Sequence, residues 1–163
     1  MATWVAVIAD TQGRADFWDV AQTLGVRAVR PLRPYVLIDC GAHFARVRGF
    51  ARDVSRELGV ETIGFIAQTT ADVHCIWVFS GGALVRELEY SRDEGGWQKV
   101  EGTPQVWEAD YCKGETLEEL KPSSTANLFE VCKRYGVEDG IADGEWTPPR
   151  RGLFAWLFRS ART

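Results

Sequence analysis

Residues 1–67 alternate between short apolar runs and two longer stretches in which apolar side chains recur at helical spacing. Four runs have the length and composition of strands: residues 4–9, 26–29, 35–38 and 60–67. The longer stretches, residues 14–24 and 44–58, each end at a glycine and are predicted to be helices. The resulting order, β-α-β-β-α-β, is typical of ferredoxin-like folds, so the sequence predicts an α+β protein.

The second predicted helix, residues 44–58, has the clearer amphipathic pattern. The apolar residues expected to face the core are Phe44, Val47, Phe50, Val54 and Leu58. Arg48, Arg52 and Arg56 lie between them, and their side chains are expected to be solvated. Gly59 is expected to end the helix.

Asp10 and Asp39 follow the first and the third predicted strands. We predict that these strands are parallel neighbours, so that both carboxylates reach the same edge of the sheet. With His43 nearby, they are candidates to hold a divalent cation, or to act as acid and base in a metal-assisted enzyme. The pattern favours the alternative that each aspartate caps the helix that follows it.

Three further strands are predicted: residues 73–79, 83–90 and 97–100. Glycine pairs at 81–82 and 95–96 mark the turns between them. The three strands form an antiparallel meander that either extends the first sheet or packs on it. Residues alternate along the middle strand, so one of its faces is expected to be wet. A last helix, capped by Ser123 or Ser124, is predicted to run to about Tyr135.

The 163 residues are enough for one domain with a core of its own. The double proline at 148–149 marks a boundary, so we expect a single α+β domain at 1–147 and a basic aromatic tail at 148–163. No apolar run approaches the ~20 residues that span a bilayer, and the first residues lack the basic start of a secretory signal. The expected location is the cytoplasm, where the four scattered cysteines are expected to be reduced thiols.

The net charge of −4 is unevenly distributed. Residues 106–147 hold ten acidic and four basic side chains, whereas residues 148–163 hold four arginines and no acidic residue. An acidic body argues against a nucleic-acid duplex as the main partner, because duplex binding needs a basic face.

The chain carries no recognisable catalytic or cofactor motif. A zinc site would need Cys40, His43, His74 and Cys75 to converge, but His74 and Cys75 are neighbours on a predicted strand and point to opposite faces. No serine lies in a G-x-S-x-G turn, and the loop after the first strand has one glycine, against three in a dinucleotide-binding loop. We therefore expect no cofactor.

Tryptophan is frequent, with seven residues, and some of them lie beside turns and acidic residues, where aromatic side chains often anchor interfaces. Packing at the edge of the core is the alternative for these. The tail, wound as a helix, places large apolar side chains on one arc and arginines largely opposite. The residues predicted to contact a partner are Trp97, Trp107, Trp146, Arg150, Arg151, Phe154, Trp156 and Phe158. The tail is expected to pack on its own domain, on a partner protein or second copy, or on an anionic membrane surface.

These features predict a non-enzymatic bacterial protein-interaction module, of an accessory, regulatory or immunity type, that acts by binding another protein or itself. One alternative is a metal-assisted enzyme that uses Asp10, Asp39 and His43. The other is a peripheral membrane protein that the tail anchors.

Overall fold

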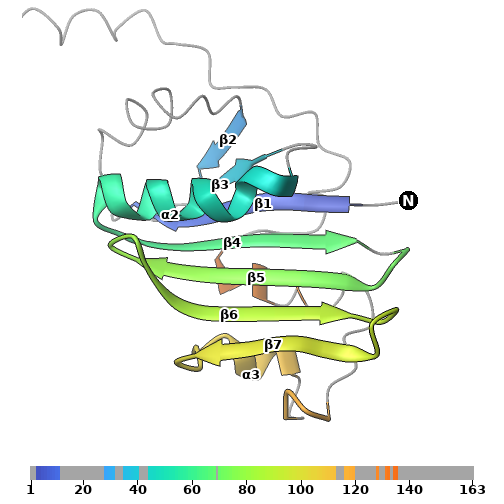
Figure 1. The fold of residues 1–163 in the computed structure, drawn as a ribbon. Helices are drawn as coiled ribbons and strands as arrows, with labels where there is room; N and C mark the ends of the chain where they lie inside the picture. Colours follow the sequence, from blue (N-terminus) through green and yellow to red (C-terminus); the bar gives the residue numbers. More distant parts are fainter. Residues whose placement is uncertain are drawn as a thin grey trace, which may run out of the picture.

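The computed structural model describes residues 3–11, 28–31, 35–40, 44–68, 70–112, 116–119, 128, 131–132 and 134–135. These residues form one antiparallel sheet of seven strands, in the order β2-β3-β1-β4-β5-β6-β7 (Figure 1). The strands are β1 (Thr3–Asp10), β2 (Ala28–Pro31), β3 (Tyr35–Asp39), β4 (Glu61–Gln68), β5 (Val73–Ser80), β6 (Ala83–Ser91) and β7 (Gly96–Gly102). The helical elements are η1 (Phe44–Arg46), α2 (Val47–Leu58) and α3 (Glu108–Cys112). The protein therefore has an α+β fold.

The relation between β1 and β3 differs from the prediction. The two strands are neighbours, as expected, but they pair antiparallel, with Asp10 opposite Tyr35 and Asp39 opposite Ala6. Asp39 thus lies level with a residue four positions before Asp10, about 13 Å away along the strand. The prediction of parallel neighbours, with both carboxylates at one edge, is wrong.

The direction of β3 follows from the short connection before it. β2 and β3 pair antiparallel, and β3 also pairs antiparallel with β1. β1 and β2 therefore run parallel to each other, as a crossover connection requires, and β3 lies between them in the opposite direction. The sequence pattern predicted that β1 and β3 are parallel. In the structure the parallel strands are β1 and β2, which are separated by β3.

Helix α2 covers one face of the sheet over β1, β4 and β5 (Figure 1). Of the five residues predicted to face the core, Val47, Val54 and Leu58 are buried, Phe50 is only partly buried, and the side chain of Phe44 lies outside the described part of the structure. Ala51 is buried on the same face. The helix ends at Gly59, whose φ of 66° is left-handed, as predicted from the glycine.

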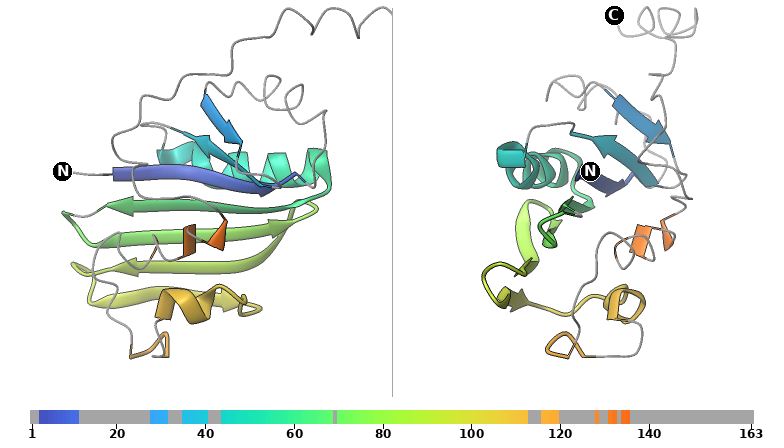
Figure 2. Two further views of the ribbon diagram at one scale, coloured as in Figure 1. Left: turned by 180° about the vertical axis from the view of Figure 1, so that it is seen from behind. Right: turned by 90° about the vertical axis from the view of Figure 1, so that its right-hand side faces the viewer.

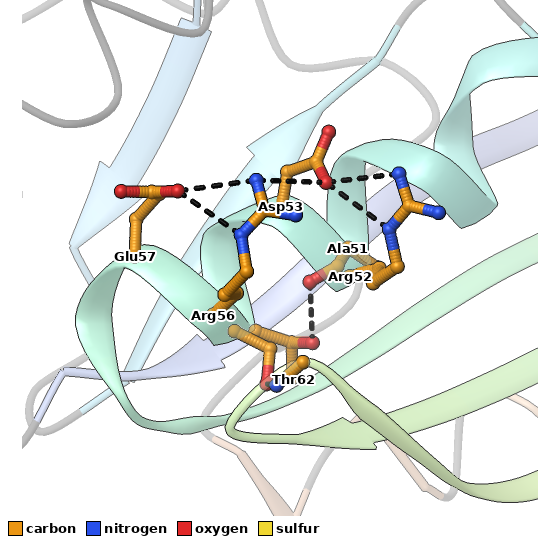
Figure 3. A network of polar contacts seen from close by, with 8 residues as sticks. Ala51, Arg52, Asp53, Arg56, Glu57 and Thr62 are labelled. Atoms are coloured by element: carbon orange, nitrogen blue, oxygen red, sulfur yellow. Dashed lines mark hydrogen bonds and ion pairs between the residues drawn. The ribbon is translucent and has the colours of Figure 1, made fainter.

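The outer side of α2 is solvated and carries a row of ion pairs (Figure 3). Asp53 lies 3.0 Å from Arg52 and 3.4 Å from Arg56, and Arg56 also lies 3.1 Å from Glu57. These arginines are exposed, as predicted. Exposed pairs of this kind each contribute roughly 0–1 kcal/mol, so they do not hold the helix on the sheet.

Close contacts on the inner side hold α2 against β4. The Thr62 hydroxyl donates a hydrogen bond of 2.9 Å to the Ala51 carbonyl (Figure 3). Gly64, next to it on the same face, has so little space that an added Cβ would lie 2.9 Å from the Ala51 Cβ. The helix therefore approaches the strand more closely than a larger residue at 64 would permit.

The buried Ser55 hydroxyl joins three segments at the end of α2. It donates a 2.6 Å hydrogen bond to the Val60 carbonyl and accepts a 3.0 Å hydrogen bond from the Gly82 N–H. Gly82 lies in the tight turn between β5 and β6, and both turn glycines have positive φ, which the Gly-Gly pair predicted.

The sheet separates two apolar cores, one on each face. Figure 2 shows α2 on one face of the sheet and α3 on the other. The core under α2 is built from Val5, Val7, Ala9, Ile38, Val47, Ala51, Val54, Leu58, Val60, Trp77 and Phe79. The opposite core lies between the sheet and the segments that include α3, and its largest members include Phe65, Ile76, Leu88, Trp107, Tyr111, Leu128 and Tyr135. Both faces of the central strands are therefore covered by protein.

The predicted meander is present, and it extends the first sheet through the pairing of β4 with β5. The expectation of a wet face on β6 is wrong, because Arg86 and Glu87, on opposite faces, are only 4% and 2% exposed.

The first predicted helix, residues 14–24, lies outside the described residues. Most of the predicted helix 123–135 does too, although its described apolar positions are buried. No helix within the described ranges is long and apolar enough to cross a membrane.

Candidate functional site

Arg86 is held on one face of β6 by the carboxylate of Glu108, the first residue of α3. Its guanidinium donates two hydrogen bonds of 2.8 Å to the two Glu108 oxygens, and a third of 3.0 Å to the Gly102 carbonyl. Glu108 Oε1 also accepts a 2.7 Å hydrogen bond from the Gln105 N–H. Each buried charge is thus paired and hydrogen-bonded, the condition under which burial of a charge is tolerated. The pair fastens α3 to the sheet.

Glu87 occupies the opposite face of β6, beneath the start of α2. Its Oε1 accepts a 2.9 Å hydrogen bond from the Trp77 indole N–H. Arg48 Nη2 lies 3.0 Å from Oε1 and 3.1 Å from Oε2, and Lys99 Nζ lies 3.4 Å from Oε1. One buried carboxylate thus joins α2, β5 and β7, which lie on three different parts of the chain.

The backbone groups of β7 alternate between facing β6 and facing outward. The Thr103 N–H donates a 2.9 Å hydrogen bond to the Val85 carbonyl. The next pair, Gly102 with Arg86, is therefore a non-hydrogen-bonded pair. The two kinds alternate along an antiparallel ladder, so the pair that contains Val100, two positions earlier, is also non-hydrogen-bonded. The N–H and C=O of Val100 therefore point away from β6.

The outward side of β7 is an open edge among the residues that the structure describes. β7 is the last strand of the sheet, and the ribbon shows no strand beyond it (Figure 1). Among the residues that the structure describes, none forms a hydrogen bond with the Val100 N–H or C=O. Unpaired backbone groups at the edge of a sheet are a template for another strand.

The side chains of β7 differ between its two faces. Lys99 and Glu101 lie opposite Glu89 and Glu87, on the face of α2. Val100 lies on the other face, and its side chain is 41% exposed. The strand thus offers a charged face, an apolar face and an open edge between them.

An aromatic cluster supports the start of β7 on the side of α3. Trp97 packs edge-on against Tyr90, with ring centroids 5.4 Å apart, and its indole N–H donates to the Leu117 carbonyl. His74 Nδ1 lies 3.1 Å from the Tyr111 hydroxyl at the centre of the cluster. These contacts hold Trp97, the second residue of β7, against the core.

Burial sets the ionisation of several groups on both faces. Desolvation lowers the pKa of His74 to about 4, and the Asp72 carboxylate opposes this only in part, so the imidazole is neutral near pH 7. Desolvation raises the pKa of Cys75 to about 11, with smaller contributions from Glu89 and Glu87. It also raises the pKa of Cys132 to about 12. Both thiols are therefore protonated at neutral pH and are poor nucleophiles.

The three residues considered as metal ligands are not brought together. Asp10 ends β1, while Asp39 lies level with Ala6 in the neighbouring strand, and His43 lies outside the described residues. Asp10 instead lies near Glu61, whose pKa is raised by burial and, secondly, by the Asp10 charge. In the part of the chain that the structure describes, no three His, Cys, Asp or Glu side chains are placed to hold a metal ion.

The residues predicted to contact a partner have different positions. Trp97 is half-buried at β7, next to the open edge. Trp107 is 2% exposed and packs inside the core of the chain itself, with its ring 6.4 Å from that of Tyr111. The others lie outside the described residues: Trp146, Arg150, Arg151, Phe154, Trp156 and Phe158. Their role in binding stays a prediction.

The sequence did not reveal that Arg86 and Glu87 are buried on β6, or that the N–H and C=O of Val100 on β7 point away from the sheet. A charged residue on each face of one strand is the available signal, since a strand with a single wet face would carry charge on that face alone. The partners, Arg48 and Glu108, lie far away in the sequence and follow no motif. No protein-family model matches the chain, and no curated protein or solved structure matches it either.

Proposed function

We propose that this chain is a non-enzymatic protein-interaction module that accepts a strand of another polypeptide at the open edge of β7. The observation that carries this proposal is the outward direction of the Val100 N–H and C=O, which have no partner among the described residues. Addition of a strand to such an edge satisfies these groups, and the main-chain hydrogen bonds supply affinity.

The surroundings of β7 support a role in binding because they make the strand rigid before a partner arrives. Glu87 holds Lys99 on one face, and the Arg86 guanidinium holds the Gly102 carbonyl at the end of the strand. Trp97 is fastened at the other end. A strand that is already ordered loses little conformational entropy on binding, and this favours affinity.

The chemistry of β7 also limits which strands it accepts. An incoming strand would place its side chains beside Lys99 and Glu101 on one face and beside Val100 on the other. Opposite charges directly across a strand pair are favourable and like charges are unfavourable. The preferred partner therefore carries an acid and a base on its charged face and a small apolar residue between them.

We also infer that the first four strands form a ferredoxin-like unit, to which β5, β6 and β7 are added. The order β2-β3-β1-β4, with every neighbour antiparallel, supports this inference, and residues 14–24 would supply the first crossover helix. In this view the added strands place the binding edge three strands away from the ferredoxin-like unit. We place the module in the bacterial cytoplasm, with an accessory, regulatory or immunity-type role.

Affinity capture from an extract of the native host tests the proposal with two matched variants. Val100→Pro removes the outward N–H without removing a β6 hydrogen bond, and Val100→Thr keeps the N–H in a residue of similar shape. We expect Val100→Pro to lose partners that the unchanged chain and Val100→Thr retain. If all three capture the same proteins, and a chain that ends at Pro149 loses them, the tail binds the partner and the proposal for β7 is wrong.

A further inference from the structure

We propose that the strand accepted at β7 is β7 of a second copy of this chain, paired antiparallel about a twofold axis at Val100. This inference rests on the proposed function, since it uses the same open edge. It adds the identity of the partner and the register of the pair.

The sequence of β7 is complementary to itself in this register. When Val100 lies opposite Val100 of the second copy, Lys99 lies opposite Glu101 of that copy, and Glu101 lies opposite its Lys99. The twofold axis thus generates two identical ion pairs on either side of one apolar contact. Cross-strand pairs of both kinds stabilise antiparallel sheets.

The hydrogen-bond phase of β7 fits the same register. Because the Val100 N–H and C=O point outward, the two Val100 residues form a hydrogen-bonded pair that exchanges two bonds across the axis. Lys99 and Glu101 then occupy non-hydrogen-bonded pairs, in which the Cα atoms are only about 4.5 Å apart and side chains approach most closely. The charged residues therefore meet where cross-strand contact is strongest.

Neighbouring registers of the same phase are unfavourable. A twofold axis at residue 101 places Glu101 opposite Glu101 of the second copy. A twofold axis at residue 99 places Lys99 opposite Lys99 of the second copy. Like charges directly opposite each other destabilise a strand pair. The charge pattern therefore selects the register centred on Val100.

The charges of the monomer leave room for the new pairs. Glu101 is exposed and forms no ion pair within the part of the chain that the structure describes. Lys99 lies 3.4 Å from Glu87, and its side chain is 31% exposed, so part of it is open to a second strand. On the other face, Val100 is 41% exposed and gains cover from its copy. Pairing thus gives Glu101 a partner and covers Val100, both of which are exposed in the monomer.

Sedimentation velocity over a range of protein concentrations tests the inference through charge reversal. We expect the unchanged full chain to show a monomer–dimer equilibrium. Glu101→Lys places lysines opposite each other and Lys99→Glu places glutamates opposite each other, so each should raise the dimer dissociation constant at least tenfold. A mixture of the two variants restores both ion pairs, and we expect it to form heterodimers near the affinity of the unchanged chain.

The double variant K99E/E101K is the internal control, because it exchanges the charges but keeps each pair opposite in sign. We expect it to dimerise, and circular dichroism melts check that every variant is folded. A dimer that Glu101→Lys and Val100→Pro leave unchanged would overturn the inference, and so would a chain that stays monomeric at every concentration. If the chain is monomeric but Val100→Pro still abolishes capture of a host protein that Val100→Thr retains, the proposed function stands and only the second copy is excluded.

Discussion

Arg86 and Glu108 are joined by two parallel hydrogen bonds of 2.8 Å, although 22 residues separate them in the chain. Both side chains are almost fully buried, at 4% and 10% exposure. The pair connects β6 with α3, which packs on the core that contains Trp107 and Tyr111. Loss of the pair should therefore lower the free energy of unfolding of the whole domain.

Replacement of Glu108 alone should be far more harmful than replacement of the pair. Glu108→Ala leaves the Arg86 charge buried without a partner, which typically costs about 3–5 kcal/mol. The double variant R86M/E108L removes both charges and should lose clearly less, although the Gly102 carbonyl also loses a donor. Urea unfolding measures both free energies of unfolding. Equal losses for the single and the double variant would show that the charge of Arg86 is not what matters.

Gly102 and Gly95 provide a matched pair of glycine substitutions. Their φ values are almost equal, at 86° and 87°, so alanine suffers similar backbone strain, about 1–2 kcal/mol, at either position. An added Cβ at Gly95 meets nothing within 4 Å, whereas at Gly102 it would overlap the Val85 carbonyl oxygen. We expect Gly102→Ala to lower the free energy of unfolding by about 2–3 kcal/mol more than Gly95→Ala, which is the upper part of the range for overpacked sites. Thermal melts of the two variants, side by side, decide the matter.

His74 should make the protein sensitive to mild acid. Its pKa falls from 6.5 to about 4 on folding, so in this interval the unfolded chain binds a proton that the folded chain does not. The free energy of unfolding therefore decreases as the pH falls from 6.5 towards 4, by up to about 3 kcal/mol from this residue. His74→Phe removes the titration. Urea unfolding between pH 7 and pH 5 should show a shallower pH dependence in the variant, and parallel curves would contradict the prediction.

Phe50 should matter less than its place in the amphipathic pattern implied. A fully buried phenylalanine costs about 3–5 kcal/mol when changed to alanine, but Phe50 is only partly buried at the edge of its core. We expect Phe50→Ala to cost about 1–2 kcal/mol, less than the change of a fully buried side chain of similar size. Val54→Ala, at 0% exposure on the same helix, is the comparison. If Phe50→Ala exceeds Val54→Ala by several-fold in chemical unfolding, the phenyl ring is buried more deeply than the structure shows.

Local patterns were sufficient to predict most elements of the fold. The strands of the meander, the helix ending at Gly59 and the tight turn at Gly81 and Gly82 all depend on residues within a few positions of each other. Periodicity and glycine punctuation express such short-range preferences directly. These predictions are therefore confirmed to within a few residues.

The errors concern relations between distant segments. Whether β3 runs parallel or antiparallel to β1 depends on which strand lies between which, and no local pattern carries this information. A wet face was expected on β6 because the partners of Arg86 and Glu87, which are Glu108 and Arg48, lie elsewhere in the chain. The open edge of β7 could not be predicted for the same reason. Which of its N–H and C=O groups point outward depends on how β7 pairs with β6.

The Ser55 hydroxyl joins the end of α2, the start of β4 and the turn between β5 and β6. None of these segments can move away without leaving a buried polar group unsatisfied, so local opening at one of them disturbs the other two. They should therefore open as one cooperative unit. Amide hydrogen exchange at Val60 and Gly82 would then follow a common opening free energy, although the two residues are distant in sequence.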